Sequence, residues 1–272
     1  MSEERRTIGV IAGNGLYPET FVRAAKPHGV RLAVAAFKGE TRPELESEVE
    51  AWEWMRVGQL VKMINFFQKE GAKECVMVGQ ISPHRLFDFR PDLRTITLLA
   101  KLKERNAESL FGGVADELEK EGITVLPATT FLDDCLPAAG HVFGPKLKEK
   151  GLADAEFGIR IAKETSRLDI GQSVVVRQGT VLAVEAFEGT DQCVRRGGEL
   201  GKGKKVKLIK VSKPKQDLRF DVPVIGPHTV ESCHEAGVSA IVIEAGKTLL
   251  LGREEVRRLC EEYKVTLHAV EA

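Results

Sequence analysis

Short runs of apolar, often β-branched residues alternate along the first half of the chain with segments whose apolar residues recur every three or four positions. The runs predict β-strands at residues 8–12, 32–37, 75–78 and 124–126. Between the second and third strands, Leu60, Val61, Ile64 and Phe67 have the spacing of one face of an amphipathic helix. Because such alternation is typical of parallel strands joined by crossover helices, we expect an N-terminal Rossmann-like α/β domain with a parallel sheet.

The pattern changes after Pro127. Proline and glycine interrupt the following residues, which predicts a crossover between domains and a boundary near residue 150. The second half has a predicted helix at 153–168 and predicted strands at 173–177, 181–187, 206–211, 241–243, 249–251 and 266–270. The dipeptide Gln178-Gly179 predicts a hairpin, so the sheet of this half should be mixed. A chain of 272 residues has room for two domains, and we predict an N-terminal α/β domain at 1–150, including the crossover, and a C-terminal α/β catalytic domain at 151–272.

Composition excludes several classes of protein. Hydrophobic residues make up 43% of the chain and charged residues 29%, as in soluble globular proteins. Forty basic and forty acidic residues give a net charge of zero, so we expect no nucleic-acid partner. The longest uncharged stretch, residues 7–18, is too short to span a bilayer, and no apolar signal core precedes it, so we expect a cytoplasmic protein. The five cysteines form no Cys-x-x-Cys pair and are expected to be reduced.

The turn after the first predicted strand is a candidate ligand site. Gly13, Asn14 and Gly15 let the backbone turn tightly and approach a ligand, and Pro18 suits the start of a helix whose free N–H groups would face an anion. A dinucleotide fingerprint would need a third glycine in place of Pro18 and an acidic residue at the end of the second strand, where Lys38 follows. The turn therefore favours a phosphate or sugar-nucleotide contact, with a tight turn that binds no ligand as the alternative.

The third predicted strand leads into a second candidate turn. It contains Gly79 and Gln80, followed by His84 and Arg85. Because open α/β sheets bind ligands at the carboxyl ends of their strands, we expect this turn to lie beside the first one and to contact the substrate. The alternative for His84 and Arg85 is that they are solvated loop residues.

Charged residues also gather where the strand predicted at 181–187 gives way to a helix. Glu188 and Asp191 are carboxylates that can hold a divalent cation, Arg195 can contact a phosphate, and Thr190 is a candidate substrate contact. The alternative is that Thr190 or Asp191 caps the helix.

Residues 213–227 form the densest polar segment of the chain. Three prolines hold it extended, and the cations Lys213 and Arg219 are interleaved with the carboxylates Asp217 and Asp221. The composition suits a rigid loop that binds a diphosphate and a metal, with a surface connection as the alternative. The sequence has no zinc-helix motif, nucleophile elbow, Walker loop, Nudix box or two-metal phosphoesterase cluster, so a diphosphate hydrolase here needs a different kind of site.

Several of these motifs occur together in one known family. They are GNGLYP at 13–18, RLDIGQ at 167–172, Glu185 with EGTD at 188–191 and two arginines at 195–196, and KP at 213–214 with RFDVP-x-x-G at 219–226. In their order and spacing they resemble the LpxI family of UDP-2,3-diacylglucosamine pyrophosphatases, and the resemblance extends over almost the whole chain.

The resemblance implies a magnesium-dependent hydrolase of lipid A biosynthesis, which cleaves UDP-2,3-diacylglucosamine to UMP and 2,3-diacylglucosamine 1-phosphate, known as lipid X. It also implies two α/β domains with the lipid between them, a homodimer, and a peripheral contact with the cytoplasmic face of the inner membrane. The family's essential aspartate matches Asp221. Asp217 falls where related chains can carry Glu.

Together, residues and resemblance predict that water attacks one phosphorus while Mg²⁺ and basic side chains stabilise the charge that develops on the oxygens. Asp221 is the candidate metal ligand or water-orienting base. The remaining candidates are Glu188 and Asp191 as metal ligands, or as partners of metal ligands, and Arg195, Arg219 and Lys213 as phosphate contacts. A non-catalytic sugar-nucleotide sensor that uses the same residues is the alternative.

Overall fold

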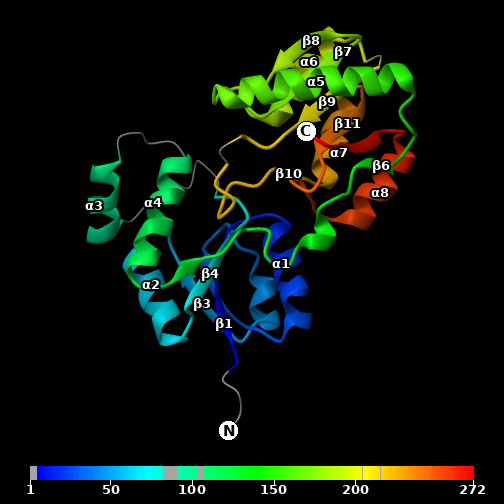
Figure 1. Cartoon of the computed structure of the whole chain (residues 1–272). Helices are drawn as coiled ribbons and strands as arrows, with labels where there is room; N and C mark the ends of the chain where they lie inside the picture. The colour runs from blue at the N-terminus through cyan, green and yellow to red at the C-terminus, as the bar shows by residue number, and fades with distance from the viewer. Residues whose placement is uncertain (1–4, 82–90, 103–106, 204, 215) are drawn as a thin grey trace. The chain divides into compact units, whose positions relative to one another are not determined.

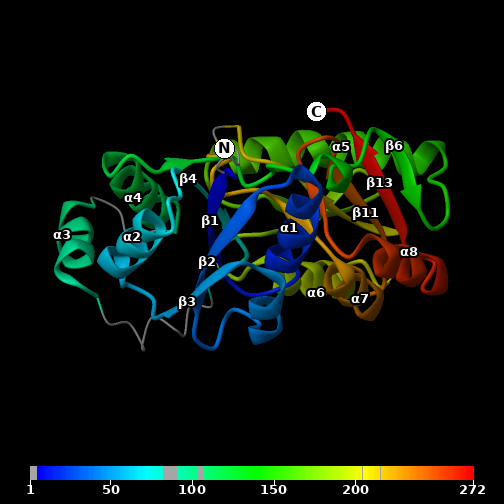
Figure 2. The same ribbon diagram turned by 90° about the horizontal axis from the view of Figure 1, so that it is seen from below.

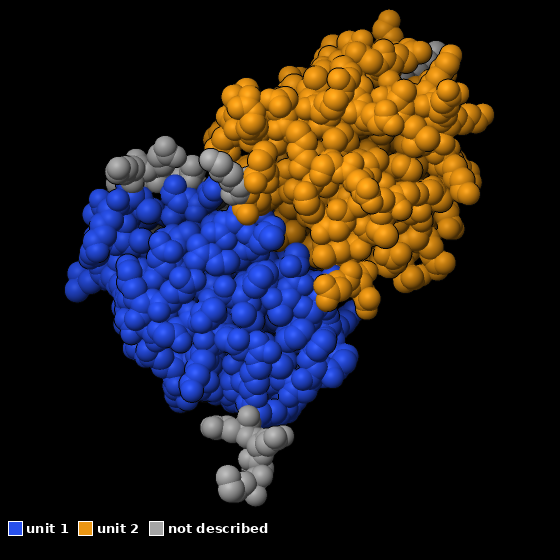
Figure 3. Space-filling model, in the orientation of Figure 1, with its two compact units in different colours: residues 1–132, 217–221 blue, residues 133–216, 222–272 orange. Residues whose placement is uncertain are grey.

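The computed structural model describes residues 5–81, 91–102, 107–203, 205–214 and 216–272. The chain divides into two compact units (Figures 1 and 3). Met1–Leu132 with Asp217–Asp221 form the first, and Asp133–Gln216 with Val222–Ala272 form the second. A five-residue segment from late in the sequence therefore belongs to the first unit. The boundary at residue 150 stays a prediction.

The first unit is built on the expected parallel sheet. Its strands are β1 (Thr7–Ala12), β2 (Arg31–Phe37), β3 (Ala51–Met55), β4 (Glu74–Val78) and β5 (Thr124–Val125), in the order β3-β2-β1-β4-β5. Figure 2 shows β3, β2 and β1 side by side. The helices are α1 (Tyr17–Ala25), α2 (Leu60–Lys69), α3 (Leu93–Lys101) and α4 (Ala107–Lys120), with short 3₁₀ turns at Lys26–His28 and Pro43–Glu48.

The core of the first unit depends on a glycine in its central strand. Phe67 of α2 is fully buried, and a Cβ built on Gly9 of β1 would lie 2.9 Å from its ring. Real Cβ atoms do not approach a ring carbon so closely, so Gly9 makes room for the ring. The predicted apolar face of this helix is thus confirmed for Leu60, Ile64 and Phe67, which are buried, whereas Val61 is exposed.

The second unit has the expected mixed sheet. Its six strands are β6 (Gly140–Phe143), β13 (Thr266–Val270), β11 (Val238–Glu244), β9 (Val206–Lys210), β7 (Ser173–Arg177) and β8 (Thr180–Val184), in that spatial order. The central β13, β11 and β9 are parallel, and β7 is antiparallel to both of its neighbours. The β7–β8 hairpin is confirmed, and Gln178 and Gly179 both have positive φ, as its two-residue turn requires.

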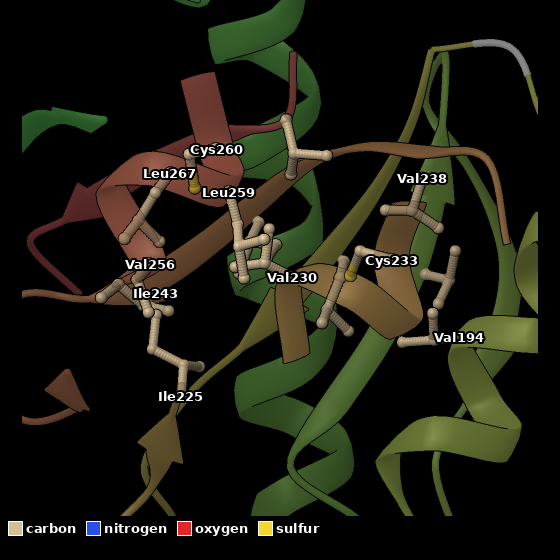
Figure 4. Close-up of a cluster of buried hydrophobic side chains, with 14 of the residues drawn as sticks. Val194, Ile225, Val230, Cys233, Val238, Ile243, Val256, Leu259, Cys260 and Leu267 are labelled. Atoms are coloured by element: carbon tan, nitrogen blue, oxygen red, sulfur yellow. The ribbon is translucent and has the colours of Figure 1, made fainter. Parts of the chain in front are cut away.

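A small parallel pair, β10 (Val224–Ile225) with β12 (Leu249–Leu250), completes the strands described in this unit. The helices are α5 (Glu149–Arg167), α6 (Thr190–Leu200), α7 (Pro227–Glu235) and α8 (Arg253–Glu262), with a 3₁₀ turn at Asp133–Cys135. Side chains of α6, α7 and α8 form one apolar core with the sheet (Figure 4), and α5 forms a separate apolar cluster against it. The sheet therefore has helices on both faces.

The pairing brings several strand ends to one edge of this sheet. Ser173 at the start of β7 is opposite Lys210 at the end of β9, and Val184 at the end of β8 pairs with the neighbouring Val174. Glu244, the last residue of β11, follows Ile243, which pairs with Lys210. We call this the carboxyl edge of the second unit, because the parallel strands of the sheet end there. In the part of the chain that the structure describes, no helix is both long and apolar enough for a membrane span.

Candidate functional site

The turns that follow β1 and β4 lie side by side, as the parallel topology predicts. Gly13 donates its N–H to the carbonyl of Val78 (2.8 Å), and Asn14 donates its N–H to that of Gln80 (2.7 Å). A Cβ on Gly13 would lie 2.4 Å from the Gln80 oxygen, and one on Gly79 would lie 2.7 Å from the Asn14 oxygen. These two glycines are therefore needed for the close approach of the two turns, whereas a Cβ on Gly15 would meet open space within 4 Å.

The acidic residue that sequence reasoning missed here stands beyond the end of β2. Glu40 is 7% exposed, and its Oε2 accepts a hydrogen bond from Asn14 Nδ2 (2.5 Å). The next residue, Thr41, donates its hydroxyl to the carbonyl of Ala12 at the end of β1. The first turn is thus joined to β2 as well as to β4. The only sign of Glu40 in the sequence is its position, two residues after Lys38, which follows the second predicted strand.

The candidate turn residues His84 and Arg85 lie outside the residues that the structure describes.

Asp221 lies in the late segment of the first unit. Its backbone N–H donates to the carbonyl of Asp217 (2.9 Å), which closes a turn over residues 217–221. The side chain is half-buried, and among the described residues nothing forms a hydrogen bond or ion pair with its carboxylate. This carboxylate is therefore available to a ligand.

Arg219, predicted as a phosphate contact, pairs with carboxylates of the first unit. Its guanidinium donates to both oxygens of Asp217 and to Oε1 of Glu119 (2.9 Å). Hydrogen bonds from the Arg219 side chain hold the pKa of Asp217 below its usual range, and bonding to Asp217 raises the pKa of Arg219. The contact between Arg219 and phosphate stays a prediction.

In the second unit, neither Thr190 nor Asp191 caps α6, so that alternative is wrong. Gly189 occupies the N-cap position, with φ of 82°. The Thr190 hydroxyl donates to Oε1 of Glu185 (2.8 Å), a carboxylate that is 8% exposed. Asp191 turns toward α7, where its oxygens meet Nε2 of His228 (3.0 Å) and the hydroxyl of Ser232 (3.3 Å).

Glu188 pairs with Arg196 and not with Arg195. It accepts a hydrogen bond from Arg196 (2.5 Å) and another from the backbone N–H of Ala186 (3.0 Å). Hydrogen bonds from its own backbone and from that of Ala186, together with the Arg196 charge, hold the pKa of Glu188 below its usual range. Arg195 donates to Gln192 (3.0 Å). A hollow beside α6 is lined by Glu188, Gln192, Arg195, Arg196 and Glu199.

The carboxyl edge of the second unit holds a buried acid that sequence reasoning also missed. Glu244 is 1% exposed and accepts hydrogen bonds from Lys163, Lys247 and Ser212. Burial raises its pKa, but the lysines and Ser212 outweigh this and leave the pKa lowered. Lys213, a predicted phosphate contact, follows Ser212 and pairs with Asp169 (2.6 Å).

Three buried oxygens near this edge have no hydrogen-bond partner within the described residues. They are Oε1 of Gln172, Oγ of Ser173 and Oε2 of Glu185. Glu185 follows Val184 directly, and its N–H donates to the Ser173 carbonyl (2.9 Å). Buried polar atoms are usually satisfied, so water, an ion or a ligand group is the expected partner.

The residues fit Mg²⁺ in donor chemistry. Asp221 in the first unit and Asp191 in the second each offer hard carboxylate oxygens. Mg²⁺ can be held by a single carboxylate together with substrate phosphates and water. Both oxygens of Glu188 already accept hydrogen bonds. Across the described ranges, no three His, Cys, Asp or Glu side chains form a ready metal cluster, so any metal would depend on oxygens from substrate or water.

Comparisons with known proteins cover nearly the whole chain. The LpxI N-terminal domain model matches residues 7–135, and the LpxI C-terminal domain model matches residues 138–268. A protein of Caulobacter vibrioides named UDP-2,3-diacylglucosamine pyrophosphatase LpxI is 31% identical over 261 residues, which are 92% of this chain and 92% of that protein.

Among solved structures, the biotin carboxylase domain dimer of Hydrogenobacter thermophilus 2-oxoglutarate carboxylase matches 64% of this chain. The chain covers 35% of that structure, with 15% identity and a TM-score of 0.26. These values are too low to indicate a shared fold.

Proposed function

The chain belongs to the LpxI family, and from this membership we propose that it is a UDP-2,3-diacylglucosamine pyrophosphatase, a hydrolase of lipid A biosynthesis. The reaction splits the diphosphate of UDP-2,3-diacylglucosamine to give UMP and 2,3-diacylglucosamine 1-phosphate. The observation that carries the proposal is the match to a relative of that name over 92% of both chains. Both family domain models also match, in their proper order.

Asp221 is the residue that we place at the reaction. Its carboxylate is half-buried, fixed by a backbone turn, and has no protein partner within the described residues. Such a group can accept a proton from the attacking water or bind the cation. The water oxygen forms a bond to one phosphorus, the anhydride P–O bond breaks, and the leaving phosphate takes the electron pair.

We propose Mg²⁺ as the cofactor, with Asp221, Glu188 and Asp191 as the predicted metal ligands. When bound, the metal would neutralise negative charge on the diphosphate oxygens. The proposed substrate contacts are the two paired turns in the first unit (Gly13, Asn14, Gly15, Gly79 and Gln80) and, in the second, Thr190, Arg195 and Lys213. The N–H groups of Gly13 and Asn14 already bind backbone carbonyls, so we propose that these turns meet the substrate through their remaining polar groups. The basic side chains of Arg195 and Lys213 suit phosphate oxygens.

The deciding experiment is release of UMP from UDP-2,3-diacylglucosamine, followed by thin-layer chromatography. We expect turnover by the wild type, loss in excess chelator, and recovery when Mg²⁺ is added. Asp221→Asn should fold normally and lose about 10²- to 10⁴-fold in kcat. Glu255→Gln, which alters an exposed ion pair on α8, is the control and should keep wild-type turnover.

Two outcomes would refute this proposal. Binding of substrate without UMP release by the wild type would favour the alternative of a sugar-nucleotide sensor. A folded Asp221→Asn variant with more than about a tenth of wild-type turnover would remove Asp221 from the chemistry.

The proposal extends to a homodimer that meets the membrane surface where its lipid substrate resides. Large apolar side chains are exposed on the described surface, including Leu93 of α3 and Phe187 before α6. Such side chains can insert at a lipid interface. Light scattering should give twice the chain mass of 29.9 kDa, and flotation with vesicles should recover the protein. A monomer that stays with the aqueous fraction would contradict this extension.

A further inference from the structure

The turn that carries Asp221 is held by a clamp of charged side chains within the first unit. Nε of Arg219 lies 3.0 and 3.1 Å from the two oxygens of Asp217, and Nη2 lies 2.7 Å from Oδ2. Nη1 lies 2.9 Å from Oε1 of Glu119 on α4. All three guanidinium nitrogens thus face carboxylates, in the forked geometry that makes arginine pairs strong and directional.

This arrangement bears on what Arg219 does. A further carboxylate, Asp116, lies 3.9 Å from Nη1, so three acids surround one cation. Local charge is therefore negative overall, which disfavours a phosphate at the guanidinium. Arg195 differs, because the partner that the structure gives it is the neutral amide of Gln192. Of these two arginines, Arg219 is the one whose guanidinium is fully engaged by carboxylates within the described residues.

Backbone and apolar contacts connect the clamp to Asp221. Asp217 accepts the Arg219 N–H at Oδ1 (3.0 Å), and its carbonyl accepts the N–H groups of Phe220 (3.2 Å) and Asp221 (2.9 Å). The Phe220 ring packs beside Phe111 of α4, with centroids 5.9 Å apart. The residue immediately before Asp221 is thus anchored by its ring, and the turn itself by Asp217.

A second backbone bond fixes the start of the turn. The carbonyl of Leu218 accepts the N–H of Ala128 (2.7 Å), which follows β5. Both the α4 helix and the segment after β5 therefore determine where Asp221 lies. A displacement of about 1 Å in a reacting group can cost on the order of 10²-fold in rate.

We propose that Glu119, Asp217 and Arg219 are positioning residues, which hold the turn so that the Asp221 carboxylate keeps its place at the reaction. The inference rests on the proposed function, in which Asp221 takes part in the hydrolysis. It assigns Arg219 a role through Asp221 in place of the predicted contact with phosphate.

The test uses Glu119→Gln in the full-length protein. Glu119 is partly exposed on α4, so the substitution should not prevent folding. We expect kcat for UMP release to fall about 3- to 10-fold with KM little changed, because a single charge-assisted bond is weakened. Arg219→Lys loses the forked geometry and should lower kcat further, by about 10- to 100-fold. The double variant should lose less than the product of the two single effects.

Glu121→Gln is the matched control. Glu121 follows α4 directly and pairs with Arg94 (2.6 Å) on α3, so its loss breaks a similar ion pair away from the turn. It should leave kcat unchanged. Hydrogen exchange supplies a readout that does not depend on turnover. Amides of residues 217–221 should exchange faster in Glu119→Gln than in the wild type or in Glu121→Gln.

The outcomes separate the positioning role from the proposed function. If the wild type releases no UMP, the proposed function is refuted whatever exchange shows. If the wild type is active and Glu119→Gln keeps its kcat and its exchange pattern, only the positioning role is refuted. A rise in KM at constant kcat for Arg219→Lys, with no effect of Glu119→Gln, would instead return Arg219 to the phosphate.

Discussion

Replacing Glu244, at the carboxyl edge of the second unit, measures how much one buried carboxylate contributes to the free energy of unfolding. Its Oε2 accepts hydrogen bonds from Lys163 Nζ (2.5 Å) and from the N–H (3.0 Å) and hydroxyl (2.8 Å) of Ser212, while Oε1 accepts one from Lys247 Nζ (2.5 Å). The carboxylate thereby ties the end of β11 to α5 and to the segment after β9. We expect the cost of a substitution to follow the number of these bonds that it breaks.

Glu244→Gln keeps the shape of the side chain. Its amide oxygen can replace Oε2 and retain the bonds from Ser212 and Lys163, and its nitrogen replaces Oε1 and loses Lys247. The Lys247 side chain is half exposed, so that bond contributes less than about 1 kcal/mol. Removing the charge also weakens the bond from Lys163, and the free energy of unfolding should fall by about 2 kcal/mol.

Glu244→Leu removes every acceptor. The N–H and hydroxyl of Ser212 then lose their partner in the interior, at about 1–3 kcal/mol for each unsatisfied group, and Lys163 loses its counter-ion. We expect a loss of about 4 kcal/mol, within the range of about 3–5 kcal/mol for breaking a buried ion pair. Against a typical total stability of about 5–15 kcal/mol, this variant should be clearly weakened.

Urea unfolding followed by circular dichroism measures these differences. Trp52 and Trp54 both lie in β3, so tryptophan fluorescence reports the first unit and shows whether the loss is confined to the second. Glu255→Gln on α8 is the control, and its unfolding midpoint should not change. Equal losses for the Gln and Leu variants, or a loss below about 1 kcal/mol for Glu244→Leu, would refute the reasoning, because the network would then contribute no more than a surface pair.

Three further predictions concern other parts of the fold. Burial raises the pKa of Asp154, but hydrogen bonds from Lys207 and two backbone N–H groups leave it lowered. Asp154 therefore stabilises the fold fully above its ordinary pKa of about 4, and this stabilisation is lost as the pH falls through its lower pKa in the folded state. Asp154→Asn should remove this loss, so that the free energy of unfolding falls less steeply at acid pH than in the wild type. Gly13→Ala should cost about 1–3 kcal/mol in thermal unfolding because its Cβ would meet the opposite turn, whereas Gly29→Ala, with a φ of 65° and open space, should cost only about 1 kcal/mol. In a thiol titration of the folded protein, only the half-buried Cys135 should react, and slowly, because burial raises the pKa of its thiol. The four buried cysteines should react only after denaturation.

The pattern of apolar residues predicted the helices and strands that bury an apolar face in one of the cores. The parallel sheet of the first unit and the mixed sheet with its hairpin in the second are both confirmed. The strands at Ala51–Met55 and Gly140–Phe143 were missed because each lies at a sheet edge, where most side chains are only half-buried and no apolar run forms. Val224–Ile225 was missed because two residues are too few for a pattern.

The sequence predicted where the two turns of the first unit meet, because parallel topology alone brings those strand ends together. It did not predict Glu40 or Glu244. A charged side chain is normally exposed, and its burial depends on partners distant in the sequence: Asn14 is 26 residues from Glu40, and Lys163 is 81 residues from Glu244. No local pattern carries that information.

The charged residues around Asp221 could not be assigned roles from the sequence either. Cations interleaved with carboxylates can bind a ligand or bind each other, and composition does not distinguish the two. In the folded chain, Asp217 and Arg219 bond to each other, whereas the carboxylate of Asp221 has no such bond among the described residues. The turn explains the difference, because Asp217 accepts the N–H of Arg219 and thereby brings the two side chains together, while Phe220 directs the chain into the apolar core before Asp221. Neighbouring charged residues of one motif can thus have different roles, which depend on the hydrogen bonds that each side chain makes in the folded chain.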